Sequence, residues 1–258
     1  FIKNGQIDVN PKKGKIGGAY SWGNGELPTF VLLNHTNDFQ SMQTLAHEMG
    51  HSIHTYFSKK HQPPRYQDYP FSTAEVASTL FENILSEEVE QTLTEKERII
   101  MLHDKIMNDV VTIFRQIACF NFEVELHKEI RKNGSVSSQD MAQMMQKHLK
   151  SYVGDAFDVT ELDGYFYVNW SHIRRHFYVY SYAYGALISS ALYQKWKENP
   201  SFATQIEKFL SAGGSMSPED IFKSIGIDTS NMSFFKTGLK AIEKDIDLLE
   251  KLTKGKKL

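Results

Sequence analysis

Apolar residues recur every three or four positions through most of this chain, a spacing that predicts amphipathic helices. The first such stretch runs from Phe39 to Phe57, and the proline-rich residues 61–70 end it. Ser137 and Ser217 stand where N-caps are expected. Further helices are expected over the ranges 72–93, 95–132, 137–152, 172–198 and 233–252, and from residue 217. The pattern therefore predicts a mainly helical chain.

Residues 11–34 are rich in glycine and depart from the helical spacing. Two short strands are expected there, Lys15–Ser21 and Thr29–Leu33, so a small β-element accompanies the helices. No internal repeat, low-complexity tract or clear linker divides the sequence. We therefore expect one α+β domain, mainly α, over residues 1–258.

Composition narrows the classes of protein that fit. The formal net charge of −2 over 258 residues indicates no broad attraction to nucleic acid or to membranes. No apolar run approaches the roughly 20 residues of a membrane span. The single cysteine, Cys119, excludes an intrachain disulfide and favours a reducing compartment, so we expect a cytoplasmic location. The chain starts at Phe1 without an initiator Met or a signal peptide, which predicts a fragment of a longer protein.

The pentapeptide His47-Glu48-Met49-Gly50-His51 is an H-E-x-x-H motif within the first expected helix. Spacing of four places the two imidazoles on one helix face, where they can share a metal ion. Glu48 lies beside them and can accept a proton from a metal-activated water. Composition, with 10 histidines, predicts about 0.03 such motifs by chance. Two ordinary histidines of an amphipathic helix are the alternative. The helix register disfavours it, because the two histidines lie next to an apolar stripe and should face inward with it; the stripe is formed by Met42, Leu45, Ala46, Met49 and Ile53.

A catalytic zinc site needs a third protein ligand. Glu75, at the start of the next expected helix, is the candidate, although Ser72-x-x-Glu75 also has the form of a structural capping box. Glu82 follows seven residues later on the same face, in an otherwise apolar segment, and could orient a histidine ligand. His54, one turn beyond His51, is a weaker alternative as third ligand.

These residues together resemble the thimet oligopeptidase superfamily of zinc metallopeptidases, and within it the oligoendopeptidase F branch. The similarity implies a zincin-like, multihelical catalytic domain of an oligopeptidase, lacking a helical N-terminal part. It also implies one zinc per chain, bound by His47, His51 and Glu75, with Glu48 as general base. The matching segments are Gly14–Gly23 (GKIGGAYSWG), Thr44–His54 (TLAHEMGHSIH), Phe71–Asn83 (FSTAEVASTLFEN), Phe177–Gly185 (FYVYSYAYG) and Leu210–Ser215 (LSAGGS).

The resemblance also implies a histidine and tyrosines that stabilise the oxyanion. His172, Tyr178 and Tyr182 match those positions, and His176 is a rival for the histidine. A tyrosine hydroxyl suits this role because it donates a hydrogen bond while remaining neutral near pH 7. On a helix, Tyr178 and Tyr182 would share a face.

The expected function is zinc-dependent hydrolysis of internal bonds in short peptides. One alternative is another zinc peptidase that attacks chain ends, as a carboxypeptidase or an aminopeptidase does. The other is a peptide-binding fragment that holds zinc without full activity. A structural zinc site has no need of Glu48, so the complete motif favours catalysis. Short peptides are the expected partners, and neither nucleic acid nor membrane is expected.

Overall fold

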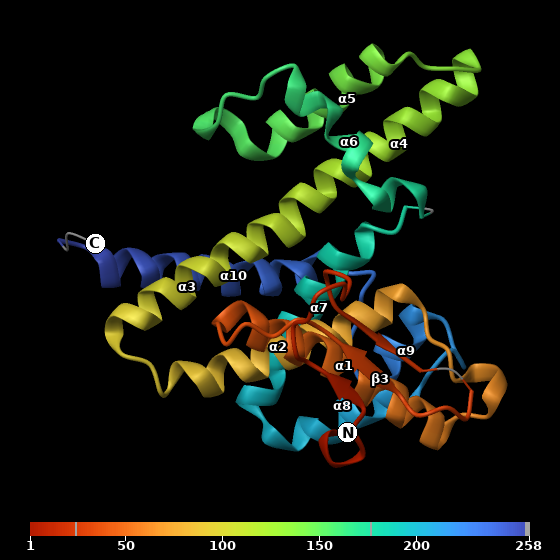
Figure 1. Cartoon of the computed structure of the whole chain (residues 1–258), viewed down its shortest axis with the longest axis vertical. Helices are drawn as coiled ribbons and strands as arrows, with labels where there is room; N and C mark the ends of the chain where they lie inside the picture. The colour runs from red at the N-terminus through yellow and green to blue at the C-terminus, as the bar shows by residue number, and fades with distance from the viewer. Residues whose placement is uncertain (24, 176, 256–258) are drawn as a thin grey trace. The chain divides into compact units, whose positions relative to one another are not determined.

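The computed structural model describes residues 1–23, 25–175 and 177–255 (Figure 1). Contacts divide the chain into a first unit, Phe1–Ile106 with Gly185–Leu258, and a second unit, Met107–Tyr184. Helices dominate both units and a small sheet belongs to the first, so the expected fold class is confirmed. Among the described residues, no helix is both long enough and apolar enough to cross a bilayer. The single catalytic domain over residues 1–258 stays a prediction.

The sheet of the first unit has the strand order β1-β3-β2. Strand β1 (Ile7–Asp8) pairs in parallel with β3 (Phe30–Leu32). Strand β2 (Tyr20–Trp22) pairs antiparallel with β3, and Ser21 lies opposite Val31. Strand β2 is therefore an edge of this sheet.

The strand expected at Lys15–Ser21 is wrong over most of its length, because only its last two residues belong to β2. Gly18, within the expected strand, has φ +83°, a left-handed backbone that interrupts an extended strand, and Gly14, directly before it, has the same φ. The strand expected at Thr29–Leu33 is confirmed as β3, shorter by one residue at each end.

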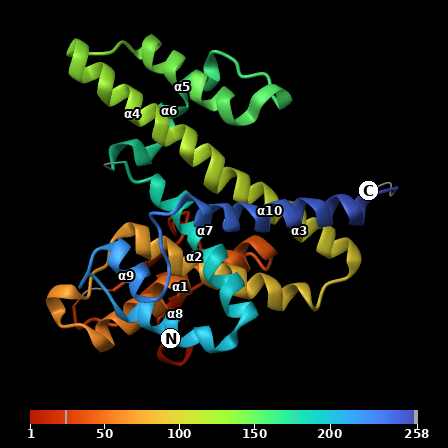
Figure 2. The ribbon, with the colours of Figure 1, turned by 180° about the vertical axis from the view of Figure 1, so that it is seen from behind.

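Helices α1 (Phe39–His61) and α2 (Phe71–Glu90) pack against one another, and β2 and β3 lie against α1 (Figures 1 and 2). The carboxylate of Asp38 caps α1 by accepting the Ser41 N–H at 2.7 Å. The fully buried positions of α1 are small or polar, including Gly50, whereas the apolar stripe expected to face inward is only partly buried. Small side chains allow the neighbouring elements to approach the α1 backbone closely.

Gly50 lies at a close approach of α1 and α2. A Cβ built on Gly50 would lie 2.6 Å from Ser78 Cα and 3.0 Å from the Ala77 carbonyl oxygen. Backbone atoms at such distances leave no room for a methyl group. The cost of glycine in a helix interior, about 1 kcal/mol, is therefore offset by the close contact that it permits.

We expect Gly50→Ala to reduce the free energy of unfolding by about 1–3 kcal/mol, because the methyl group forces the two helices apart. Thermal and denaturant unfolding of the metal-free protein measures the change. Gly17→Ala is the matched control: a Cβ at Gly17 meets nothing within 4 Å, so its effect should stay within about 0.5 kcal/mol. Equal stability of the two variants would contradict the close-contact explanation.

The capping box expected at Ser72 and Glu75 is wrong. Helix α2 starts directly after Pro70, no side chain caps it, and Ser72 is buried within its first turn. The Pro70 carbonyl accepts the N–H groups of Thr73 and Ala74, each at 3.0 Å, in place of a serine cap. Glu75 is thus free of the capping role that the sequence suggested.

The core of the first unit is formed by α2, the sheet and the C-terminal helices. The predicted N-cap Ser217 is confirmed, since its hydroxyl accepts the Asp220 N–H at 3.2 Å. The helices are α7 (Tyr180–Glu198), of which residues from 185 onward belong here, α8 (Ala203–Ser211), α9 (Pro218–Ser224) and α10 (Met232–Thr253). Fully buried core residues include Val31, Val76, Leu80, Ile188, Leu192, Phe209, Ile221 and Phe222.

The helix expected over residues 95–132 is interrupted. Helix α3 (Glu95–Val110) passes through a π-helical turn, Val111–Arg115, into α4 (Gln116–Asn133). Gly134, with φ +79°, ends α4 in the left-handed region that glycine adopts most easily.

In the second unit, α4 packs against α5 (Ser138–Val153), and both figures show the two helices side by side. Ser137 caps α5 by accepting the Asp140 N–H at 3.1 Å, as predicted. A short helix, α6 (Phe166–Asn169), follows. The core cluster comprises Cys119, Phe122, Leu126, Met145, Leu149, Trp170 and Val179.

The helix expected to start near residue 172 is wrong at its N-terminal end. Ser171–Arg174 form a separate 3-10 turn, and α7 begins at Tyr180. Phe177 has φ 59°, a left-handed conformation that a continuous right-handed helix excludes. Tyr178 therefore precedes α7 and does not share a helix face with Tyr182.

Candidate metal centre

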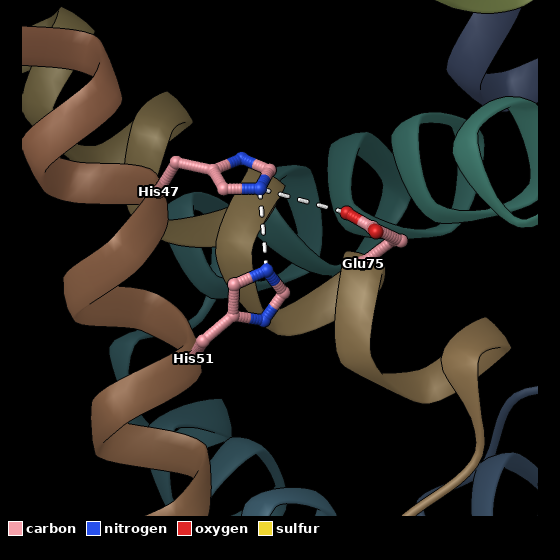
Figure 3. A group of neighbouring side chains, drawn as sticks. All are labelled: His47, His51 and Glu75. Carbon is pink, nitrogen blue, oxygen red and sulfur yellow. Dashed lines mark hydrogen bonds and ion pairs between the residues drawn. The ribbon is translucent and has the colours of Figure 1, made fainter. Parts of the chain in front are cut away.

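His47 and His51 point from α1 toward Glu75 of α2, one helical turn apart (Figure 3). The Nε2 atoms of the two histidines lie 3.2 Å apart, and His47 Nε2 lies 3.6 Å from Glu75 Oε2. One ligand atom from each residue lies within 4.8 Å of the others. Helices α1 and α2 thus bring residues from two separate stretches of the sequence together into one three-residue group.

The geometry of this group fits a tetrahedral metal ion. Two nitrogens at about 2.0–2.1 Å from a zinc ion are separated by roughly 3.3 Å at the tetrahedral angle, close to the spacing of the two imidazoles. Two imidazoles and one carboxylate form a donor set that zinc accepts, with the fourth position left for water or substrate. The three residues could therefore hold a catalytic metal. Their assignment as ligands stays a prediction.

Glu82 orients the first histidine of the group. Its Oε1 is hydrogen-bonded to His47 Nδ1, which leaves His47 Nε2 directed at Glu75 and His51. A carboxylate on the other ring nitrogen is the usual partner of a metal-binding histidine, because it fixes the ring and its tautomer. The contact suggested for Glu82 from its helical spacing is therefore present in the structure.

The electrostatics of the two histidines differ. Burial disfavours a proton on His47, but the hydrogen bond and charge of Glu82, with the charge of Glu75, outweigh it and raise the pKa of His47 to about 9. Burial and the neighbouring His47 lower the pKa of His51 to about 3. In the metal-free protein this site therefore holds a proton on His47, which a bound cation would displace.

Glu48 is a buried carboxylate, 6% exposed, next to the group in sequence. Burial raises the pKa of Glu48 to about 6, with Glu75 adding to the rise, while His47 and the backbone N–H of Ser21 act in the opposite direction. A carboxylate with a pKa near neutrality is suited to accept a proton and return it. Ser21 belongs to β2, so the edge strand also contacts Glu48.

Glu75 is positioned by close contacts on two sides. Its side chain is buried, and the Ser78 hydroxyl donates to its Oε2 at 3.4 Å. A Cβ on Gly185 would lie 2.8 Å from Glu75 Cβ and 2.9 Å from its carbonyl carbon, so glycine alone lets α7 pack here. Gly185 closes the matched segment at Phe177–Gly185, but its contact with Glu75 could not be predicted from the sequence.

His54, the alternative third ligand, is not in the group of His47, His51 and Glu75 that the described residues form. Its ring is fully buried and stacks on Tyr69 at a centroid distance of 3.7 Å. Burial lowers the pKa of His54 to about 3, so the ring is neutral. The hydroxyl of Tyr69 in turn donates to the His51 carbonyl at 3.2 Å. His54 thus packs against Tyr69, although it belongs to the same helix as His47 and His51.

His172, Tyr178 and Tyr182 form a cluster in the second unit. The hydroxyl of Tyr182 lies 3.2 Å from His172 Nε2. The His172 ring stacks on Tyr178 at 5.4 Å, and the two tyrosine rings meet edge to face at 5.3 Å. Burial and the charge of Arg175 lower the pKa of His172, which favours the neutral ring. The rival histidine, at position 176, lies outside the described residues.

Comparisons with known proteins agree with the motifs. The model of peptidase family M3 matches residues 1–241. The chain is 32% identical over 253 residues to oligopeptidase PepF of Bacillus subtilis, covering 97% of this chain and 38% of the relative. It is 34% identical over 250 residues to the chromosomal oligoendopeptidase F of Lactococcus lactis, covering 95% of this chain and 41% of the relative. The chain thus spans about two fifths of the length of these relatives.

Solved structures are similar over the same extent. A crystal structure from Chlamydophila abortus matches 96% of this chain and 42% of its own, with a TM-score of 0.82 and 30% identity. Oligoendopeptidase-F from Enterococcus faecium matches 84% of this chain and 40% of its own, with a TM-score of 0.71 and 27% identity. The expected resemblance to the oligoendopeptidase F branch is confirmed. Since the family model covers all but the last residues, this chain belongs to peptidase family M3.

Proposed function

We propose that this chain carries the catalytic centre of a zinc-dependent oligopeptidase that hydrolyses internal bonds of short peptides. The observation that carries the proposal is the grouping of His47, His51 and Glu75 at metal-binding distances, with the buried Glu48 beside them. Membership of family M3 and the relatives named oligoendopeptidase F support peptides as substrates. The free, buried Cys119 supports a cytoplasmic location.

The roles of the residues follow from their chemistry. When bound by His47, His51 and Glu75, zinc would supply the charge that acidifies a water molecule and polarises the scissile carbonyl. Glu48 would take the proton of that water and pass it to the leaving amine. His172, Tyr178 and Tyr182 would donate hydrogen bonds to the developing oxyanion.

The edge strand β2 supports the binding of an extended peptide. Strand β2 lies at one edge of the sheet, and its residues Tyr20 and Trp22 are each 50% exposed. An extended peptide can add to such an edge through main-chain hydrogen bonds, which recognise backbone rather than sequence. This mode suits an enzyme that accepts many short peptides.

Zinc content and cleavage products together test the function. The protein is dialysed against metal-free buffer, its zinc is measured by elemental mass spectrometry, and a defined ten-residue peptide (roughly the length at which internal and terminal cuts differ clearly) is digested with chelator and with zinc restored. We expect about one zinc per chain and internal cleavage that the chelator abolishes. Release of single terminal residues would indicate a carboxypeptidase or aminopeptidase instead. Binding of peptide at saturating zinc without cleavage would indicate a non-catalytic fragment.

A further inference from the structure

A buried carboxylate of the second unit contacts the backbone immediately before Tyr178. Glu123 is 1% exposed, and its Oε1 accepts the N–H of Phe177 at 3.0 Å. A hydrogen bond to a charged acceptor is stronger than one between neutral groups, and burial protects it from competition by water. The backbone of Phe177 is therefore held at one defined point.

Phe177 needs such a restraint because of its conformation. Its φ is 59°, in the left-handed region that bulky side chains rarely adopt. A residue remains in that region only where its surroundings impose the conformation. The next residue closes a turn, since the N–H of Tyr178 donates to the Arg175 carbonyl at 3.0 Å. The conformation of Phe177 consequently sets the direction in which the Tyr178 side chain leaves the backbone.

One face of α4 supplies the restraint. Phe120, Glu123 and His127 are spaced by three and four residues, so they project from the same side of α4. The ring of Phe177 lies 5.9 Å from that of Phe120 and 4.8 Å from that of His127, between centroids. The two rings hold the side chain while Glu123 holds the backbone. This face of α4 carries no sequence motif, so the sequence predicted a helix here but no role for these three residues.

We infer that Glu123 is a positioning residue: its carboxylate keeps Phe177 left-handed and thereby keeps Tyr178 stacked on His172. The consequence for catalysis rests on the proposed oxyanion role of that cluster. Because an oxyanion exists only in the transition state, misplacement of Tyr178 should lower kcat and leave KM nearly unchanged.

The first measurement compares two substitutions of the carboxylate. We expect Glu123→Ala to lower kcat by about 10- to 100-fold with KM unchanged. Glu123→Gln should restore most of kcat, because its amide oxygen can still accept the Phe177 N–H. Glu129→Ala, which removes a carboxylate elsewhere on α4, is the matched control and should leave kcat within about twofold of the original value. Equal losses in Glu123→Ala and Glu123→Gln would overturn the inference.

The second measurement isolates the backbone of Phe177. Phe177→Gly and Phe177→Ala both remove the ring, but only glycine adopts a positive φ without a penalty from Cβ. In the Glu123→Ala background we expect the glycine variant to have a several-fold higher kcat than the alanine variant. With Glu123 intact, the ratio of the Phe177→Gly kcat to the Phe177→Ala kcat should be smaller. If Glu123→Ala fails to fold, this comparison in the original background still tests whether position 177 needs a positive φ. Equal ratios in the two backgrounds would show that Glu123 does not act through Phe177.

A readout without turnover separates this inference from the proposed function. With fluorotyrosine at position 178, fluorine NMR of the metal-free protein should give one resonance, which Glu123→Ala splits or broadens and Glu123→Gln preserves. If Tyr178→Phe and His172→Ala leave kcat unchanged while the resonance still responds to Glu123→Ala, the oxyanion role fails and the positioning role stands. If the fluorine resonance is unchanged by Glu123→Ala, the positioning role is overturned.

Discussion

Glu48→Gln is expected to retain zinc and to lose peptide hydrolysis by about 10²- to 10⁴-fold, the contribution typical of a general base. Glutamine has nearly the shape of glutamate, so the buried side chain, 6% exposed in the original, should stay in place. Its amide cannot take a proton from water at neutral pH. The three grouped ligand candidates are unchanged, so metal content should be unchanged as well.

Steady-state kinetics on a quenched fluorescent peptide, with zinc measured on the same samples, tests this result. Glu48→Asp is the chemical control: it keeps a carboxylate but moves it back by one methylene, so activity between that of the original protein and Glu48→Gln is expected. Turnover near the original rate in Glu48→Gln would remove Glu48 from the role of base.

Glu75→Ala is expected to weaken zinc binding by more than about 100-fold, beyond the 10- to 100-fold typical of losing an outer partner of a ligand. Glu75 contributes the one carboxylate of the three-residue group, and its Oε2 lies 3.6 Å from His47 Nε2. Glu82 contacts the same histidine from its opposite nitrogen. The two acids are seven residues apart on α2, so they form a matched pair of positions with different expected roles.

Competition with a chromophoric chelator measures the affinity, and circular dichroism checks that the helices remain. Glu82→Ala should lose only about 10- to 100-fold, because the ligands persist and only their orientation is relaxed. Glu82→Gln should lose less than Glu82→Ala, since its amide oxygen still accepts from His47 Nδ1. Equal losses for Glu75→Ala and Glu82→Ala would argue that Glu75 is not a ligand.

Local sequence was sufficient for the features that depend on neighbours along the chain. Helical spacing predicted α1, and serine caps predicted the starts of α5 and α9, because a capping hydroxyl bonds a backbone N–H within three residues. The pairing of His47 with His51 on one face follows from the geometry of any α-helix. The same local rules failed at Ser72 and at Lys15–Ser21, where a proline start and left-handed glycines override the patterns.

The sequence by itself thus determined most of the helices, the family and the pair of histidines. The resemblance pointed to Glu75 as the acid beside them, but only the tertiary structure brings the two helices together and gives Glu75 and Glu82 their separate contacts with His47. The contact between Gly50 and Ser78 brings α2 close enough for Glu75 to reach His47, and Glu82 then bonds the far side of that ring. The left-handed conformation of Phe177 could not be predicted from the sequence either. A bulky residue adopts that conformation only when groups distant in the sequence, here Glu123, hold it there. Long-range contacts of this kind depend on packing between elements far apart in the chain. The local spacing of residues does not predict such packing.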